Sequence, residues 1–315
     1  MLKLRKRLSQ NIQRDDNPAK PVPLRSEFKD NVSNFDSNNC SDLEFVIPGV
    51  EKSLKLHRLT LSDTSNLIKE GLEAGRFPMD GNMYRVDWMY DASREVDKNA
   101  LVKVLQFCYG ATITVEIESG ECCAVIAALH RLKVIRAKEI IKALLTHAVE
   151  QAKKQVKNGI QLLMCAQNYP ECCSAEFCEL DMLLAEQVFT KKNLDENHET
   201  VVDGCLMKLP PKYLDMVKYG DSHTKWSEFT VRARYMRYQS ESLSQKEKED
   251  IVKKCDWNTF TSKELKELIE FKVEQDTIIA IYHYVLECTE RDRNYWRLRA
   301  TNAEREKAYN ESQNN

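Results

Sequence analysis

The segment Asn99–Leu132 constrains the fold most, because helical and extended periodicities follow one another within it. Leu101, Val104, Leu105 and Cys108 recur at the spacing of one face of an α-helix. Gly110 follows, where a helix end favours a residue that tolerates the left-handed conformation. The pattern predicts an amphipathic helix that ends just before Gly110.

The same segment continues with a strand and a second helix. The run from Thr112 to Ile117 is rich in β-branched residues, which favour a short strand. After Ser119, a potential helix cap, apolar residues again take helical spacing, at Cys122, Val125, Ile126 and Leu129. We therefore predict a helix–turn–strand–helix unit with two apolar faces to bury.

Strand patterns precede this unit and a helix follows it. Apolar residues alternate in Leu43–Ile47 and in Leu54–Leu56, and Pro48-Gly49 between them predicts a hairpin turn. Further predicted elements are one helix at His57–Leu72, a third strand at Met83–Trp88 and a helix at Ala137–Val149. Strands first and helices afterwards indicate an α+β fold.

Composition narrows the function classes. The 315 residues carry a net charge of −2, which argues against a nucleic-acid or membrane partner held by general electrostatics. No apolar run is long enough for a membrane span, and no secretory leader is visible. The 11 cysteines, an odd number, are interpreted as reduced thiols. We expect a cytoplasmic protein, with a nuclear location as the alternative.

The chain is predicted to have four parts. Residues 1–39 are expected to be a disordered polar and basic tail, with a targeting segment, a membrane-surface helix or a nuclear-import patch as alternatives. Residues 40–150 form the α+β domain, residues 151–289 a helical domain, and residues 290–315 an exposed helix or tail.

Several short motifs of the α+β domain resemble the BTB (POZ) family. They are Ser41-Asp42 before a strand, Leu56-His57-Arg58 entering a helix with Leu59, Leu61 and Ser62, Phe107-Cys108-Tyr109-Gly110 before Thr112-Ile113, and Ala127-Ala128-Leu129 followed by Leu132-Lys133-Val134. The resemblance implies a small mixed sheet capped by helices.

The following region resembles the helical BACK region that often trails a BTB domain. The matches are Asn158–Leu163 leading to Ala166, a helix opened by Ser227-Glu228 and ending near Tyr238, and a helix after Phe260 with a Thr261/Glu264 capping box. The resemblance implies an all-α domain.

The resemblance implies a homodimerising interaction module. Its dimer helix would carry His57, Leu59, Leu61, Leu67 and Ile68, although some of these leucines must also fill the core. Asp42 and Arg58 stand where the family holds an acid–base pair in a pocket near the dimer interface. The alternative for this pair is an ordinary solvent-exposed salt bridge.

Many BTB–BACK proteins bridge a cullin scaffold to a protein substrate for ubiquitylation. They use an apolar-x-Glu triplet in the loop after the dimer helix, whereas Ile68-Lys69-Glu70 lies within the predicted helix. Phe77 and Met79 are the remaining candidates for a cullin contact. Two hypotheses follow: a substrate adaptor of a cullin–RING ubiquitin ligase, or a dimeric scaffold with no ligase role.

Motifs for chemistry are weak. Cys165, Cys172, Cys173 and Cys178, with His198, invite a zinc site, but their spacing argues against it because they contain no Cys-x-x-Cys pair, and we interpret them as small buried side chains. Gly71, Gly75 and Gly81 do not form a phosphate loop. A hydrolase with a cysteine nucleophile stays a third hypothesis. We expect no enzyme activity, no metal and no cofactor.

Overall fold

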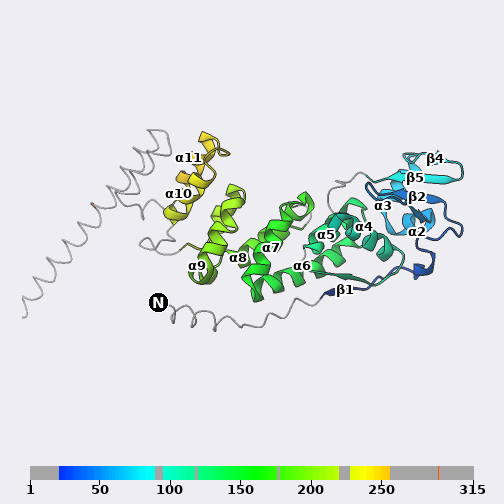
Figure 1. Ribbon diagram of the computed structural model, residues 1–315, viewed down its shortest axis with the longest axis horizontal. Helices are drawn as coiled ribbons and strands as arrows, with labels where there is room; N and C mark the ends of the chain where they lie inside the picture. The colour runs from blue at the N-terminus through cyan, green and yellow to red at the C-terminus, as the bar shows by residue number, and fades with distance from the viewer. Residues whose placement is uncertain are drawn as a thin grey trace, which may run out of the picture. The chain divides into compact units, whose positions relative to one another are not determined.

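The computed structural model describes residues 21–88, 95–117, 120–175, 178–219, 228–255 and 290. The fold is α+β, and the chain divides into two compact units, Met1–Val188 and Phe189–Asn315 (Figure 1). The predicted helix after Phe260, Ser227, and nearly all of the C-terminal helix or tail at 290–315 lie outside the described residues.

The first unit contains a small mixed sheet in the order β3-β2-β5-β4. Strand β2 (Leu43–Val46) pairs antiparallel with β3 (Leu54–Leu56) and parallel with β5 (Met83–Asp87), and β4 (Met79–Asp80) pairs antiparallel with β5. Alternation buries Leu43 and Phe45, as the apolar pattern predicts. The predicted hairpin and third strand are confirmed.

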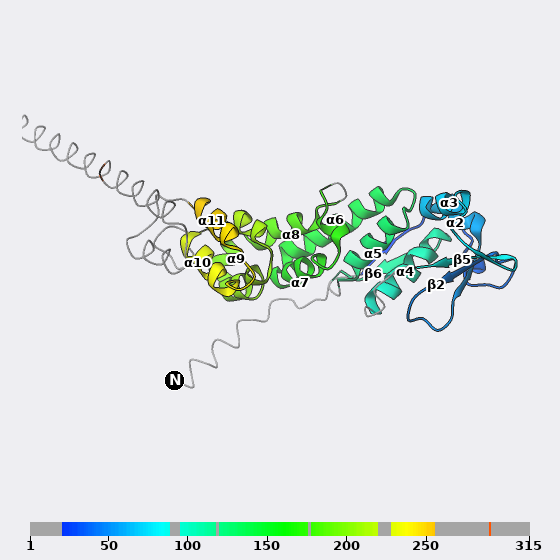
Figure 2. The ribbon, with the colours of Figure 1, turned by 90° about the horizontal axis from the view of Figure 1, so that it is seen from above.

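Two helices, not one, follow β3 and lie beside the sheet (Figures 1 and 2). They are α2 (Arg58–Thr64) and α3 (Asn66–Glu73), so the single predicted helix is wrong. At Ser65 the backbone is extended, and its Oγ accepts the Ile68 N–H and donates to the Leu132 carbonyl at 2.5 Å. A bond to a residue far along the chain breaks the helix, which local periodicity cannot show.

The predicted helix–turn–strand–helix unit is confirmed in its elements, while the predicted cap Ser119 lies outside the described residues. It consists of α4 (Glu95–Cys108), β6 (Ile113–Val115) and α5 (Glu121–Arg131), and the residues of both predicted apolar faces are buried. Gly110 has a φ of +95°, the left-handed conformation expected after α4. Strand β6 lies outside the mixed sheet, in a two-stranded sheet of its own.

The partner of β6 is β1 (Val22–Leu24), which belongs to the segment predicted as a tail. Beyond β1, the Phe28 ring contacts Phe107, the short 3-10 helix η1 (Val32–Asn34) follows, and Phe35 packs edge-on against Tyr109. The predicted disordered tail at 1–39 is therefore wrong for residues 22–35, because its scattered apolar residues find partners on α4, on Tyr109 just after it, and on β6. Residues 1–20 lie outside the described part.

Three helices and a 3-10 turn complete the first unit: α6 (Ala137–Lys154), α7 (Val156–Ala166), η2 (Pro170–Cys173) and α8 (Leu180–Val188). A side chain at Gly159 would meet Ala152 and Val188 at 3.0 Å, so α7 lies close against α6 and α8. The predicted domain boundary after residue 150 is wrong, because α6 runs through it and α7 and α8 pack onto α6.

The described part of the second unit is helical. Its elements are α9 (Lys191–His198), the π-helical turn η3 (Glu199–Asp203), η4 (Leu206–Lys208), η5 (Pro211–Met216), α10 (Glu228–Tyr238) and α11 (Gln245–Lys253). Arg232 is buried and bonds Glu228 at 2.8 Å and Asp215 at 3.0 Å. The Tyr235 hydroxyl donates to the Leu209 carbonyl at 2.6 Å.

Candidate interaction surface

Asp42 and Arg58 lie together, as the sequence comparison of motifs predicts. Asp42 directly precedes β2 and Arg58 begins α2, and the antiparallel pairing of Leu43 with Leu56 brings these two positions side by side. The Arg58 Nε lies 2.9 Å from one carboxylate oxygen of Asp42, and the Arg58 backbone N–H donates to the other at 2.8 Å.

This pair is half-exposed rather than enclosed. The Arg58 and Asp42 side chains are 47% and 34% exposed, and the guanidinium lies 5.5 Å from the centre of the Tyr84 ring. Such a pair contributes about 0–1 kcal/mol by charge attraction. Because Asp42 also accepts the first N–H of α2, it caps the helix with a negative charge where that charge is favourable. The pair fixes the start of α2.

The leucines and the isoleucine of the predicted dimer helix differ in burial. Leu61 and Ile68 are fully buried and belong to the core, and Leu67 is half-buried. Leu59 is 73% exposed on α2. Of the predicted interface leucines, Leu59 is thus the one that solvent covers.

His57 lies at the junction between β3 and α2. Its backbone N–H donates to the Tyr109 hydroxyl at 2.7 Å, and its Nε2 lies 2.8 Å from the Asn39 carbonyl oxygen. Burial raises the pKa of Tyr109 to about 12, so this hydroxyl keeps its proton at neutral pH. His57 therefore ties α2 to Tyr109 and to the N-terminal segment.

The two candidate cullin contacts differ in exposure. Phe77 is half-buried with its ring against Gly71, where a side-chain carbon would lie only 2.3 Å from it. Met79, on β4, is 57% exposed. Of the triplet Ile68-Lys69-Glu70, the isoleucine is in the core and the glutamate is 2.7 Å from Lys133.

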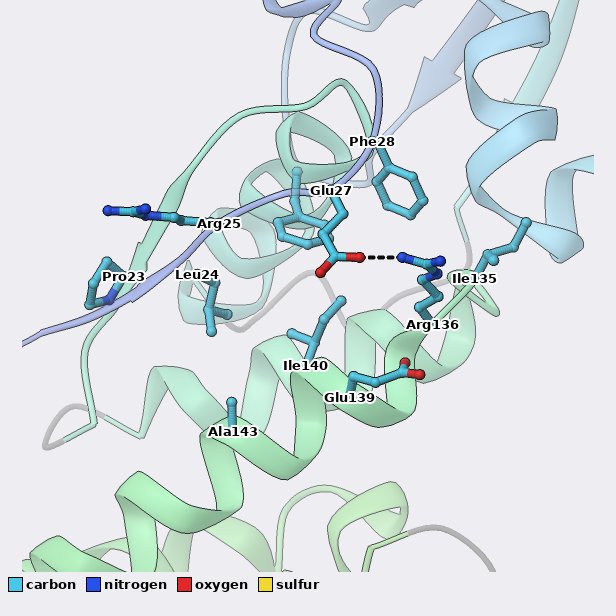
Figure 3. Close-up of a pocket in the computed structure, with 11 residues that line it drawn as sticks. Pro23, Leu24, Arg25, Glu27, Phe28, Ile135, Arg136, Glu139, Ile140 and Ala143 are labelled. Atoms are coloured by element: carbon cyan, nitrogen blue, oxygen red, sulfur yellow. Dashed lines mark hydrogen bonds and ion pairs between the residues drawn. The ribbon is translucent and has the colours of Figure 1, made fainter.

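A cavity of about 770 Å³ lies between the β1 segment and α6 (Figure 3). Leu24, Ile140 and Ala143 give it an apolar wall, and Glu27 forms an ion pair with Arg136 across it. With Arg25 and Glu139, its lining carries two positive and two negative charges. No serine, cysteine or histidine is among the residues lining this cavity, so the lining provides no obvious nucleophile.

Sequence reasoning missed this cavity, because it placed residues 21–39 in a tail. The signal available was the alternation of Val22 and Leu24, both buried, around the exposed Pro23. Three residues are too short a run to indicate a strand without knowledge of the β6 edge.

The cysteines and the helices allow two further statements. No disulfide joins the described cysteines, and within the described ranges no three His, Cys, Asp or Glu side chains are arranged to hold a metal ion. In the same part of the chain, no helix has both the length and the apolar character needed to cross a bilayer.

Comparison with known proteins adds no assignment: no family model matches this chain, and no curated protein matches it.

Proposed function

We propose that this chain is a protein–protein interaction module of the BTB (POZ) kind that forms a homodimer through α2 and the N-terminal segment. The observation that carries this proposal is Leu59, a large apolar side chain 73% exposed on α2. Covering it in an interface is worth about 1.5–3 kcal/mol per copy. The BACK-like helices after α6 would then hold other proteins.

The helix that presents Leu59 is held at both ends. Asp42 binds its first N–H, and Ser65 ends it through the bond to Leu132. A side chain on a fixed helix loses little backbone entropy on binding, which favours its use as an interface anchor.

The N-terminal segment adds a second apolar residue. Val32 is 42% exposed on η1, and Phe35, just beyond η1, contacts the same Tyr109 that binds the His57 N–H. Both segments thus pack on Tyr109. A second copy of the chain suits such a surface, since a two-fold interface pairs one patch with itself. The Asp42–Arg58 pair is then a charged rim that favours specificity more than affinity.

Substitution of Leu59 by glutamate tests the dimer. The wild type is expected to be a dimer by multi-angle light scattering at micromolar concentrations, and L59E a monomer with unchanged circular dichroism. Val50→Glu is the matched control, since Val50 is another exposed apolar residue, 37% exposed, in the β2–β3 turn. A monomeric wild type, or equal loss of the dimer in L59E and V50E, would contradict the proposal.

Of the two hypotheses, cullin–RING adaptor and dimeric scaffold, the buried Ile68 and the paired Glu70 favour the dimeric scaffold without a ligase role. The cullin–RING adaptor remains the alternative and rests on Phe77 and Met79. Pull-down with a cullin N-terminal fragment distinguishes them: no binding at micromolar concentrations removes the adaptor, whereas binding that Met79→Glu abolishes removes the scaffold. We propose no catalytic step and no cofactor, and a cytoplasmic or nuclear location.

A further inference from the structure

The cavity between the β1 segment and α6 has an apolar wall that solvent reaches. Four of the apolar side chains that line it are only half-buried: Phe28, Ile135, Ile140 and Ala143. Its volume of about 770 Å³ has room for several side chains. A contiguous apolar surface open to solvent is a common place for another segment to bind.

The edge of β1 does not favour a third strand in this cavity. Pro23 faces Thr114 across the sheet, and the Lys103 Nζ donates to the Thr114 carbonyl at 2.8 Å, so the backbone groups of this pair point outward. Pro23, like Pro21, has no N–H, so an added strand would find no donor at either residue. An occupant that satisfies its own backbone hydrogen bonds fits better, and an α-helix does so.

The cavity carries opposite charges at its two ends. Pro23 and Arg25 lie at one end, and Arg136 and Glu139 lie at the other (Figure 3). Glu27 neutralises Arg136 through their ion pair, whereas neither Arg25 nor Glu139 forms an ion pair within the described residues. The charge left for an occupant is therefore positive beside Pro23 and negative at the far end.

The first twenty residues of the chain, which precede its described part, have a matching sequence pattern. Leu4, Leu8 and Ile12 recur every four residues, the spacing of one side of a helix. Both acidic residues of the segment, Asp15 and Asp16, follow this stripe. Most of its basic residues surround the first turn of the stripe: Lys3, Arg5, Lys6 and Arg7. The segment is thus strongly basic at its start and carries its acidic residues near its end.

Chain connectivity sets the direction in which this segment enters the cavity. The described chain begins at Pro21, beside the end of the cavity that holds Arg25. A segment that folds back from this point places Asp15 and Asp16 near Arg25 and its basic start near Glu139. Both ends of the segment then meet the opposite charge.

We propose that residues 3–12 dock in this cavity of the same molecule as an amphipathic helix, with their apolar stripe against Leu24 and Ile140. The stripe from Leu4 to Ile12 is about 12 Å long at 1.5 Å per residue, and the α6 wall from residue 136 to residue 143 is about 10 Å long. The docked helix covers the half-buried wall and closes the cavity to other partners.

Hydrogen exchange on the whole chain tests this docking. We expect the amides of residues 5–12 to exchange about tenfold or more slowly than in a synthetic peptide of residues 1–20. The protection should be equal at about 1 and about 50 μM protein, because a contact within one molecule does not depend on concentration. It should also persist in Leu59→Glu, so its outcome is separate from that of the proposed dimer.

Exchange as fast as in the free peptide would overturn the docking. Protection that rises with concentration would assign the contact to a second copy and overturn docking within one molecule.

Leu8→Glu and Ile140→Glu test the two sides of the contact. Each should return residues 5–12 to the exchange rate of the free peptide. Val149→Glu is the matched control for Ile140, because Val149 is another half-buried β-branched residue of α6 and does not line the cavity. Leu8 precedes the described fold, so L8E tests the contact even if I140E fails to fold. Protection that persists in L8E or disappears in V149E contradicts the proposal.

Glu139→Lys tests the direction of the helix. It places a positive charge beside the basic start of the segment, so exchange at residues 5–7 should become about twofold to fivefold faster. Glu150→Lys is the matched control, since Glu150 is also an exposed glutamate of α6 but does not line the cavity. Equal exchange in E139K and E150K would rule out this orientation.

Discussion

At the scale of single residues, Gly110 shows how one position constrains the fold. Its φ is +95°, and a side-chain carbon there would lie 2.8 Å from both the Asp30 Cα and the Lys29 carbonyl oxygen. Gly110→Ala should therefore lower the free energy of unfolding by about 2–4 kcal/mol, from backbone strain and the clash together. Urea unfolding followed by circular dichroism measures this loss.

Gly75→Ala is the control for this glycine. Gly75 has a similar left-handed φ of +62°, but nothing lies within 4 Å of the added carbon. Gly75→Ala should lower the free energy of unfolding by the backbone strain alone, about 1–2 kcal/mol. Equal losses in G110A and G75A would show that the close approach of residues 29–30 does not contribute.

At the scale of elements, the Arg131–Glu171 ion pair joins the end of α5 to η2. Burial raises the pKa of Glu171, but the hydrogen bond and charge of Arg131 outweigh it, so the net pKa is lowered. A lowered folded-state pKa stabilises the fold above the ordinary Glu value of 4.5, and this stabilisation is lost as the pH falls through the folded-state pKa. Glu171→Gln should lower the free energy of unfolding by about 1–2 kcal/mol at pH 7. In this variant the free energy of unfolding should also fall less steeply toward acid pH than in the wild type.

Glu27→Gln is the matched control, because Glu27 also pairs with an arginine but its side chain is 74% exposed. Glu27→Gln should lower the free energy of unfolding by no more than about 0.5 kcal/mol at any pH. An acid limb that E171Q leaves as steep as in the wild type would contradict the role given to this ion pair.

The elements also show what sequence can predict. The helices α4 and α5 and the β2–β3 hairpin follow from local periodicity, because each buries one face of a regular repeat. The break at Ser65 depends on Leu132, and β1 depends on β6, so neither has a local signal. Within the candidate site, the Asp42–Arg58 pair was predictable from motif resemblance, whereas the exposure of Leu59 depends on which face of α2 packs inward.

At the scale of the whole molecule, the division between Val188 and Phe189 predicts separable responses to mutation. Arg232 is 3% exposed, and removing it leaves Glu228 and Asp215 without their buried partner. Because Asp215 keeps a second ion pair and is partly exposed, Arg232→Met should lower the free energy of unfolding by about 1–3 kcal/mol. Hydrogen exchange should rise at the amides of α9–α11 and stay unchanged in α4 and α5.

Arg234→Met provides the comparison, since Arg234 is 46% exposed and pairs with Asp203 at the surface. It should leave hydrogen exchange unchanged in both units. A rise in exchange across α4 and α5 in R232M would show that the two units unfold as one.

The two ends of α2 have a consequence for any protein bound at Leu59. Asp42 connects the first turn of this helix to the edge of β2, and Ser65 connects its last turn to the carbonyl end of α5. A protein bound at Leu59 would therefore stabilise the connections of α2 to the sheet and to the helical core at the same time. We therefore expect binding at Leu59 to slow amide hydrogen exchange at both Arg58 and Ser65.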